Sequence, residues 1–74
     1  MTPAKFRSVR EAFGLSLADW ARALGYQSKS RQNLTKQICD MESGRKPIPR
    51  SIARIVELFE RFGIPEDFLK KDER

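Results

Sequence analysis

Two short amphipathic segments, separated by a polar and basic stretch, constrain the fold of this chain more than any other feature. The apolar stripe of the first segment consists of Leu17, Trp20, Ala21 and Leu24. The second segment carries Leu34, Ile38 and Met41 at the spacing i, i+4, i+7, which is typical of a helix with one buried side. The pattern predicts two helices joined by a turn, the second with a polar outer face.

Glycine, proline and capping residues indicate where the helices begin and end. Ser16 followed by Asp19 is a helix-start signal, and Gly14, Gly25 and Gly63 are stop signals. The expected helices run from about Pro3 to Phe13, from Ser16 to Gly25, from a start between Arg31 and Leu34 to Ser43–Gly44, from Ser51 to Phe62, and from Pro65 into Lys70–Arg74. The sequence therefore predicts an all-α, compact bundle of four to five helices.

Aromatic and branched residues at helical spacing predict the core. The expected core aromatics are Phe6, Phe13, Trp20, Phe59, Phe62 and Phe68, and the buried face of the fourth helix is expected to comprise Ile52, Ile55, Val56, Phe59 and Phe62. Phe62, Ile64, Phe68 and Leu69 together exceed what one short terminal helix needs, so we also expect them to form a dimer interface.

The size of the chain predicts one domain over residues 1–74. No apolar run is long enough to span a membrane, and the N-terminus lacks the apolar core of a signal peptide. The single cysteine, Cys39, has no partner for an internal disulfide, and without histidine there is no zinc-ligand spacing. We therefore expect a cytoplasmic protein with no metal, no cofactor and no membrane partner.

Basic residues outnumber acidic ones by 15 to 10, which gives a net charge of +5. Such an excess favours polyanions, and nucleic acid is the usual one, although many proteins with this surplus bind nothing acidic. The distribution is more informative. Between residues 29 and 54 the only acidic residues are Asp40 and Glu42, against Lys29, Arg31, Lys36, Arg45, Lys46, Arg50 and Arg54.

The order of these signals resembles the Cro/C1-type helix-turn-helix family, the XRE or lambda repressor-like family. The matching pattern is Gly14-Leu15-Ser16-x-x-Asp19-Trp20-Ala21-x-x-Leu24-Gly25, then Ile38-x-x-Met41-Glu42-x-Gly44-Arg45, then Pro47. The resemblance implies a helix-turn-helix formed by the second and third helices. It also implies a transcriptional regulator, in most cases a repressor, that binds double-stranded DNA in a sequence-specific manner as a homodimer on a palindromic operator.

The sequence departs from the family pattern at two places. Leu17 stands where family members usually carry a glutamine that contacts phosphate. The segment from Tyr26 to Gln32 is longer than usual, and it either extends the recognition helix at its N-terminus or forms a basic loop along a phosphate strand.

The resemblance assigns base contacts to the outer side of the third helix. Its candidates there are Thr35, Lys36, Cys39 and Asp40, with Asn33 and Gln37 as further candidates if the helix is rotated. Lys36 could donate to guanine O6 or N7, and Thr35 could contact a thymine methyl group. Asp40 could accept a hydrogen bond from cytosine N4. The alternative to base contact is that these side chains are simply solvated. For Asp40, an ion pair with Lys36 one turn earlier is as well supported as a base contact.

Residues around the third helix are expected to hold the phosphate backbone. The resemblance places Ser43, Arg45 and Lys46 there. We expect three further basic residues to join them: Lys29, Arg31 and Arg50. The alternative for Arg45 and Lys46 is a solvated basic turn. Glu42 is expected to have a structural role, paired with an arginine such as Arg10 inside the bundle.

Other classes of function fit the sequence less well. An antitoxin-like or accessory protein that binds a partner and its own promoter is the main alternative. An enzyme is disfavoured because there is no histidine, glycine-rich phosphate loop or metal-ligand set. No aromatic platform is interleaved with the basic residues, which disfavours a general RNA binder. No feature indicates a small-molecule ligand.

Overall fold

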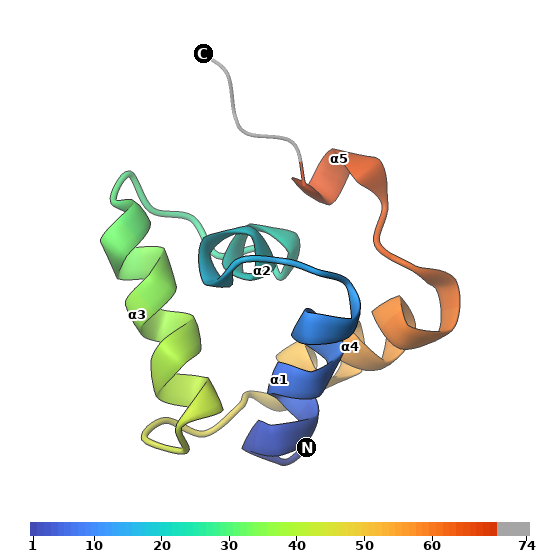
Figure 1. The fold of residues 1–74 in the computed structure, drawn as a ribbon, viewed down its shortest axis with the longest axis horizontal. Coiled ribbons are helices and arrows are strands. Elements are labelled where there is room, and N and C mark those ends of the chain that lie inside the picture. Colours follow the sequence, from blue (N-terminus) through green and yellow to red (C-terminus); the bar gives the residue numbers. More distant parts are fainter. Residues whose placement is uncertain (70–74) are drawn as a thin grey trace.

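The computed structural model describes residues 1–69, and within them the chain is all-helical with five helices (Figure 1). The helices are α1 (Pro3–Ala12), α2 (Leu17–Ala23), α3 (Arg31–Glu42), α4 (Arg50–Phe62) and α5 (Glu66–Leu69). The expected all-helical class is confirmed. The predicted fraying of the last helix at residues 70–74 lies outside the described residues.

Hydroxyl side chains set the first residue of three helices. Thr2, Ser16 and Ser30 each accept a hydrogen bond from the backbone N–H three residues later, at 3.1, 3.1 and 3.3 Å. Each bond satisfies a backbone donor that has no partner within the helix. The Ser30 cap places the start of α3 at Arg31, the earliest of the predicted positions.

Aromatic rings from three helices meet in the core. Trp20 is fully buried, with its ring 5.6 Å from that of Phe6 and 6.1 Å from that of Phe59. Its indole nitrogen has no hydrogen-bond partner within the described residues. The predicted apolar side of α3 is confirmed, because Leu34, Ile38 and Met41 are all buried.

The helices pack so that α3 stands at the edge of the molecule. Its inner side packs against α2 and α1, whereas α5 packs against α2 (Figure 1). None of the other helices covers the outer side of α3 (Figure 1). Among residues 1–69, no helix is long and apolar enough to cross a membrane.

Three aromatic residues predicted to lie in the core are exposed instead, which corrects the sequence-based prediction. Phe13, Phe62 and Phe68 retain 37%, 81% and 46% of their accessible surface. Phe13 caps the end of α1, where the chain turns away at Gly14. Phe62 is the last residue of α4 and follows Leu58, also exposed, by one turn. These two residues therefore lie on a flank of α4 beside its buried stripe.

Candidate nucleic-acid interface

The outer side of α3 presents a line of exposed polar and small residues. Gln32, Lys36, Cys39 and Ser43 follow one another at intervals of three or four residues and are all exposed. Residues at this spacing lie on one side of a helix. Because they lie opposite the buried stripe of Leu34, Ile38 and Met41, they form the side of α3 that points away from the bundle.

The four predicted base-contacting residues and the further candidate Asn33 are not equally placed for that role. Asn33, Lys36 and Cys39 are exposed, Thr35 is half-buried and Asp40 is buried at 8% exposure. The expectation that Asp40 faces solvent was wrong. The backbone N–H groups of Arg45 and Lys46 both donate to the Asp40 carbonyl, at 2.9 and 3.1 Å, so the chain after α3 doubles back at this residue.

Gln32 belongs to this outer face but was not among the predicted base contacts. The predicted helix start, between Arg31 and Leu34, left its place open, and the structure puts it in the first turn of α3. Its position four residues before Lys36 puts the two side chains on the same side of the helix. The serine cap at Ser30 is the sequence signal that could have identified it.

The acidic residues of α3 are both withdrawn from its outer surface. Asp40 is buried, and the Glu42 side chain is only 9% exposed and bound to Arg10. Between residues 26 and 54, every exposed charged residue is therefore basic: Lys29, Arg31, Lys36, Arg45, Lys46, Arg50 and Arg54. All the predicted phosphate-contacting residues, including Ser43, are exposed. This part of the surface is thus more uniformly positive than the sequence indicates.

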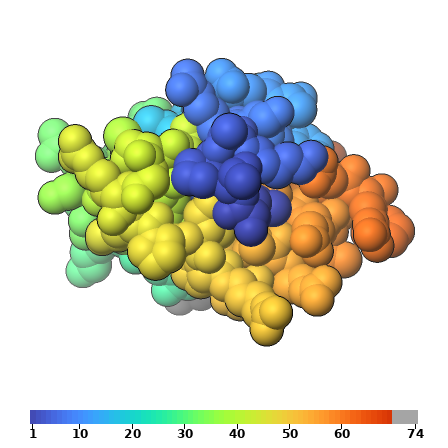
Figure 2. Space-filling view, turned by 90° about the horizontal axis from the view of Figure 1, so that it is seen from below, coloured from blue at the N-terminus to red at the C-terminus, as the bar shows by residue number. Residues whose placement is uncertain are grey.

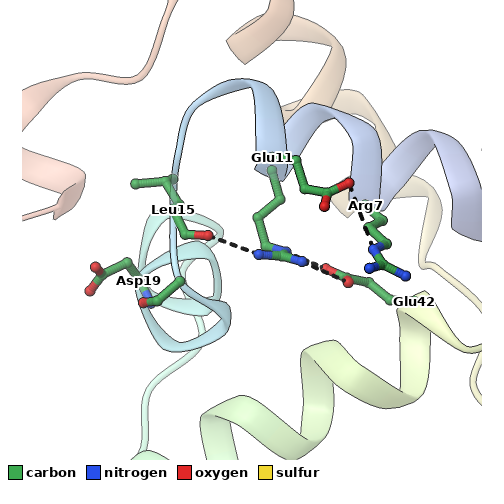
Figure 3. A network of polar contacts seen from close by, with 7 residues as sticks. Arg7, Glu11, Leu15, Asp19 and Glu42 are labelled. Atoms are coloured by element: carbon green, nitrogen blue, oxygen red, sulfur yellow. Dashed lines mark hydrogen bonds and ion pairs between the residues drawn. The ribbon is translucent and has the colours of Figure 1, made fainter.

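A polar network anchors the C-terminal end of α3 to α1 (Figure 3). The Arg10 guanidinium donates from Nε to Glu42 Oε2 at 2.7 Å and from Nη2 to Oε1 at 3.2 Å. Its third nitrogen donates to the Leu15 carbonyl at 2.9 Å. The predicted pairing of Glu42 with Arg10 is confirmed. The fork geometry fixes the end of α3 relative to α1 and to the α1–α2 turn.

The turn between α3 and α4 holds Arg45 and Lys46 close to the end of α3. Besides the two backbone bonds to Asp40, the Ser43 hydroxyl donates to the same carbonyl at 3.2 Å. Figure 2 shows this turn, in yellow, beside the N-terminal end of α1 in dark blue. Both basic side chains project from a backbone that is fixed by hydrogen bonds.

The long segment between α2 and α3 is divided between helix and loop, and its predicted extension of α3 is confirmed for its last two residues. Arg31 and Gln32 extend α3, while residues 24–30 are not helical. Ser28 Oγ accepts from the Ser30 N–H at 3.1 Å and from the Asn33 amide at 3.4 Å, which orders the approach to the helix. Lys29 is exposed beside these bonds.

Tyr26 fixes the start of this segment against α3. Its hydroxyl lies 3.7 Å from Met41 Sδ, and burial raises the pKa of the phenol above its ordinary value of 10.0. A small hollow of about 180 Å³ lies beside it, lined in part by Gln37 and Lys46. Gln37 is half-buried there and does not belong to the outer face of α3.

The four predicted dimer residues divide into two groups. Phe62 and Phe68 are exposed, whereas Ile64 and Leu69 are half-buried and pack against the core. Phe68 also makes an edge contact with Phe59 at a ring distance of 6.0 Å. Of the four, only Phe62 and Phe68 present a large exposed apolar surface.

No family model, curated protein or solved structure compared with this chain matches it. Within residues 1–69, no three Cys, Asp or Glu side chains come together in a way that could hold a metal ion. Residues 1–69 thus form a small all-helical structure in which the outer face of α3 lies among exposed basic residues.

Proposed function

We propose that this chain binds double-stranded DNA in a sequence-specific manner by inserting α3 into the major groove. We further propose that it acts as a transcriptional repressor, as a homodimer on a palindromic operator. The observation that carries the proposal is the outer face of α3, which is polar, uncovered and surrounded only by basic exposed charges. A buried Asp40 and a paired Glu42 remove the groups that phosphates would repel.

The dimensions of α3 suit the major groove. Its 12 residues span about 18 Å, whereas the groove is about 12 Å wide. A helix is about 10–12 Å in diameter with its side chains, so α3 fits into the groove and its two ends reach the flanking phosphates. Arg31 at one end and Arg45 and Lys46 at the other are then close to phosphates on opposite sides, and Arg50 adds a further cation.

The side chains at the centre of the outer face have the chemistry of base readout. Lys36 can donate to guanine O6 and N7, and Gln32 or Asn33 can pair with adenine N6 and N7. The small Cys39 allows the helix to come close to the base edges. Thr35, half-buried at the margin, can reach a thymine methyl only at the side of the groove.

Selection of bound sequences from a random duplex pool tests the proposal. We expect a palindrome with half-sites about 34 Å apart, one helical turn, or a multiple of it. The Lys36→Ala variant should lose this preference, while Arg61→Ala on α4 removes the same charge from another exposed site and should keep it. A pool that shows no enrichment over random sequence would contradict specific binding.

A second candidate is an antitoxin-like protein that binds a partner and its own promoter. The exposed apolar residues Leu58, Phe62 and Phe68 favour it, because apolar surface of this kind often marks a protein interface. The two candidates differ in one simple observation. The repressor binds its operator as the purified chain, whereas the antitoxin-like protein requires a second, co-purifying protein for full binding.

A further inference from the structure

An apolar groove of about 1290 Å³ lies between α4, α5 and the segment that leads from α2 into α3. Leu24 and Tyr26 line one wall, and Leu58, Phe62 and Phe68 line the other. The last three retain 53%, 81% and 46% of their accessible surface. Leaving large apolar side chains in water is unfavourable, because burying them lowers the free energy. This surface is therefore expected to be covered.

The shape of the surface indicates what covers it. Phe62 projects from the rim, so a small molecule lying in the groove would leave its outer side in water. A second copy of the chain offers both a projecting Phe62 and a groove that can receive one. An interface with two-fold symmetry needs this self-complementarity, because the same patch is used on both subunits.

The charges on the groove lead to the same occupant. Lys29 lies on the wall formed by the segment before α3, and Asp67 lies on the wall formed by α5. Neither forms an ion pair with any other residue in 1–69. Under two-fold symmetry, Lys29 of each copy can face Asp67 of the other. The acidic wall thus meets a basic wall when two copies pair.

We infer that the groove is a homodimer interface in which Phe62 of each copy inserts into the groove of the other. The inference rests on the homodimer of the proposed function and names its surface. Compared with the dimer interface predicted from the sequence, this interface omits Ile64 and Leu69, which pack inward, and includes Leu58 and the wall formed by the segment before α3. Because that wall leads directly into α3, the dimer axis lies nearer the N-terminal end of α3 than its C-terminal end.

Sedimentation equilibrium of the full chain without DNA tests this interface. We expect the wild-type chain to dimerise reversibly and Phe62→Ser to raise the dimer Kd at least tenfold. Phe13→Ser is the matched control, because it removes another exposed aromatic ring that does not line the groove. Both substitutions are at exposed positions, and circular dichroism confirms that each variant stays folded.

A charge exchange gives a second measurement. Lys29→Glu and Asp67→Lys should each weaken the dimer, and the two together should restore it. A wild-type chain that sediments as a monomer at every concentration would overturn the inference, as would a dimer indifferent to Phe62→Ser. Because no DNA is present, such a failure is distinguishable from failure of DNA binding, which the duplex selection measures separately.

Discussion

Arg10, on α1, binds the Leu15 carbonyl just after its own helix and the Glu42 carboxylate at the end of α3, 32 residues later. Its side chain is 15% exposed and that of Glu42 is 9% exposed. Breaking such a pair leaves one charge nearly buried without its partner, which is more costly than losing a surface ion pair.

The Glu42→Gln substitution should therefore destabilise the fold. It keeps the shape of the side chain but leaves the guanidinium uncompensated, and we expect a loss of about 3 kcal/mol in the free energy of unfolding. Urea titration followed by Trp20 fluorescence measures it. Glu57→Gln, in the exposed pair with Arg54, is the control and should cost less than about 1 kcal/mol. Equal losses would show that the Arg10–Glu42 pair stabilises the fold no more than an exposed ion pair does.

Lys36 is the residue on which specificity should depend most. The Lys36→Ala variant should lose about 1–3 kcal/mol of discrimination between the selected operator and an unrelated duplex. Binding titrations with the two duplexes measure this difference. Equal weakening on both would assign Lys36 to a phosphate contact instead.

Tyr26 gives the stability a dependence on pH in the alkaline range. Its pKa is raised in the folded state, so the folded chain holds the phenolic proton more tightly than the unfolded chain. This contribution to stability is complete below pH 10.0, the ordinary pKa, and is lost as pH rises through the higher pKa of the folded state. Urea unfolding below and above pH 10.0 should show a smaller decline for Tyr26→Phe than for wild type. Identical declines would rule out Tyr26 as the source.

At the scale of the helices, local signals predicted where most elements lie. The serine at position 16 and the glycines after α1, α2 and α4 are short-range features, and the chain obeys them. The stripe of Leu34, Ile38 and Met41 likewise predicted which side of α3 is buried. These predictions succeeded because capping and amphipathic spacing depend on neighbouring residues alone.

The errors arose where the packing of other segments, rather than helical spacing, decides burial. Asp40 is at the edge of the polar side of α3 but is buried, at the place where the chain after the helix returns to its carbonyl. Phe62 has the spacing of a core residue, but no other described element covers the flank of α4 on which it lies. Helical periodicity indicates which side of a helix is apolar, not which neighbour will cover it.

The two ends of α3 should contribute to DNA binding through phosphates. Replacing Arg45 and Lys46 by alanine should reduce affinity for all sequences and lower the salt slope by about 1.8, or about 0.9 for each lost contact. Replacing Arg31 by alanine should lower the slope by about 0.9 in the same way. Binding measured across a range of salt concentrations gives the slopes. An unchanged slope would remove that end of α3 from the interface.

Across the whole molecule, the exposed charges are unevenly distributed. The basic surface surrounds α3 and the start of α4, while the exposed acidic residues lie on α1, the rest of α4 and α5: Glu11, Glu57, Glu60, Glu66 and Asp67. The rest of the surface is mixed, because Lys5, Arg7 and Arg61 are exposed there as well, whereas the region around α3 is basic alone. A local excess of one sign orients a protein as it approaches a polyanion. The net charge alone predicted attraction to nucleic acid, but only the fold shows which side would approach it.

The groove between α4 and α5 illustrates what the sequence could not predict at this scale. Its existence depends on α5 packing against α2, a contact between segments more than forty residues apart. The excess of apolar residues near the C-terminus predicted an interface but gave no information on the shape of the surface. That shape depends on how distant segments pack and has no counterpart in local spacing.

Cys39 is the only cysteine of the chain and lies exposed on the outer face of α3. The reactivity of its thiol therefore reports, without any substitution, whether the outer face of α3 is accessible to solvent. A maleimide should label Cys39 readily in the free protein and slowly once the selected operator is added, and protein labelled beforehand should fail to bind. Mass spectrometry of timed samples follows the reaction. Labelling at the same rate with and without operator would mean that this side of α3 stays open to solvent in the complex.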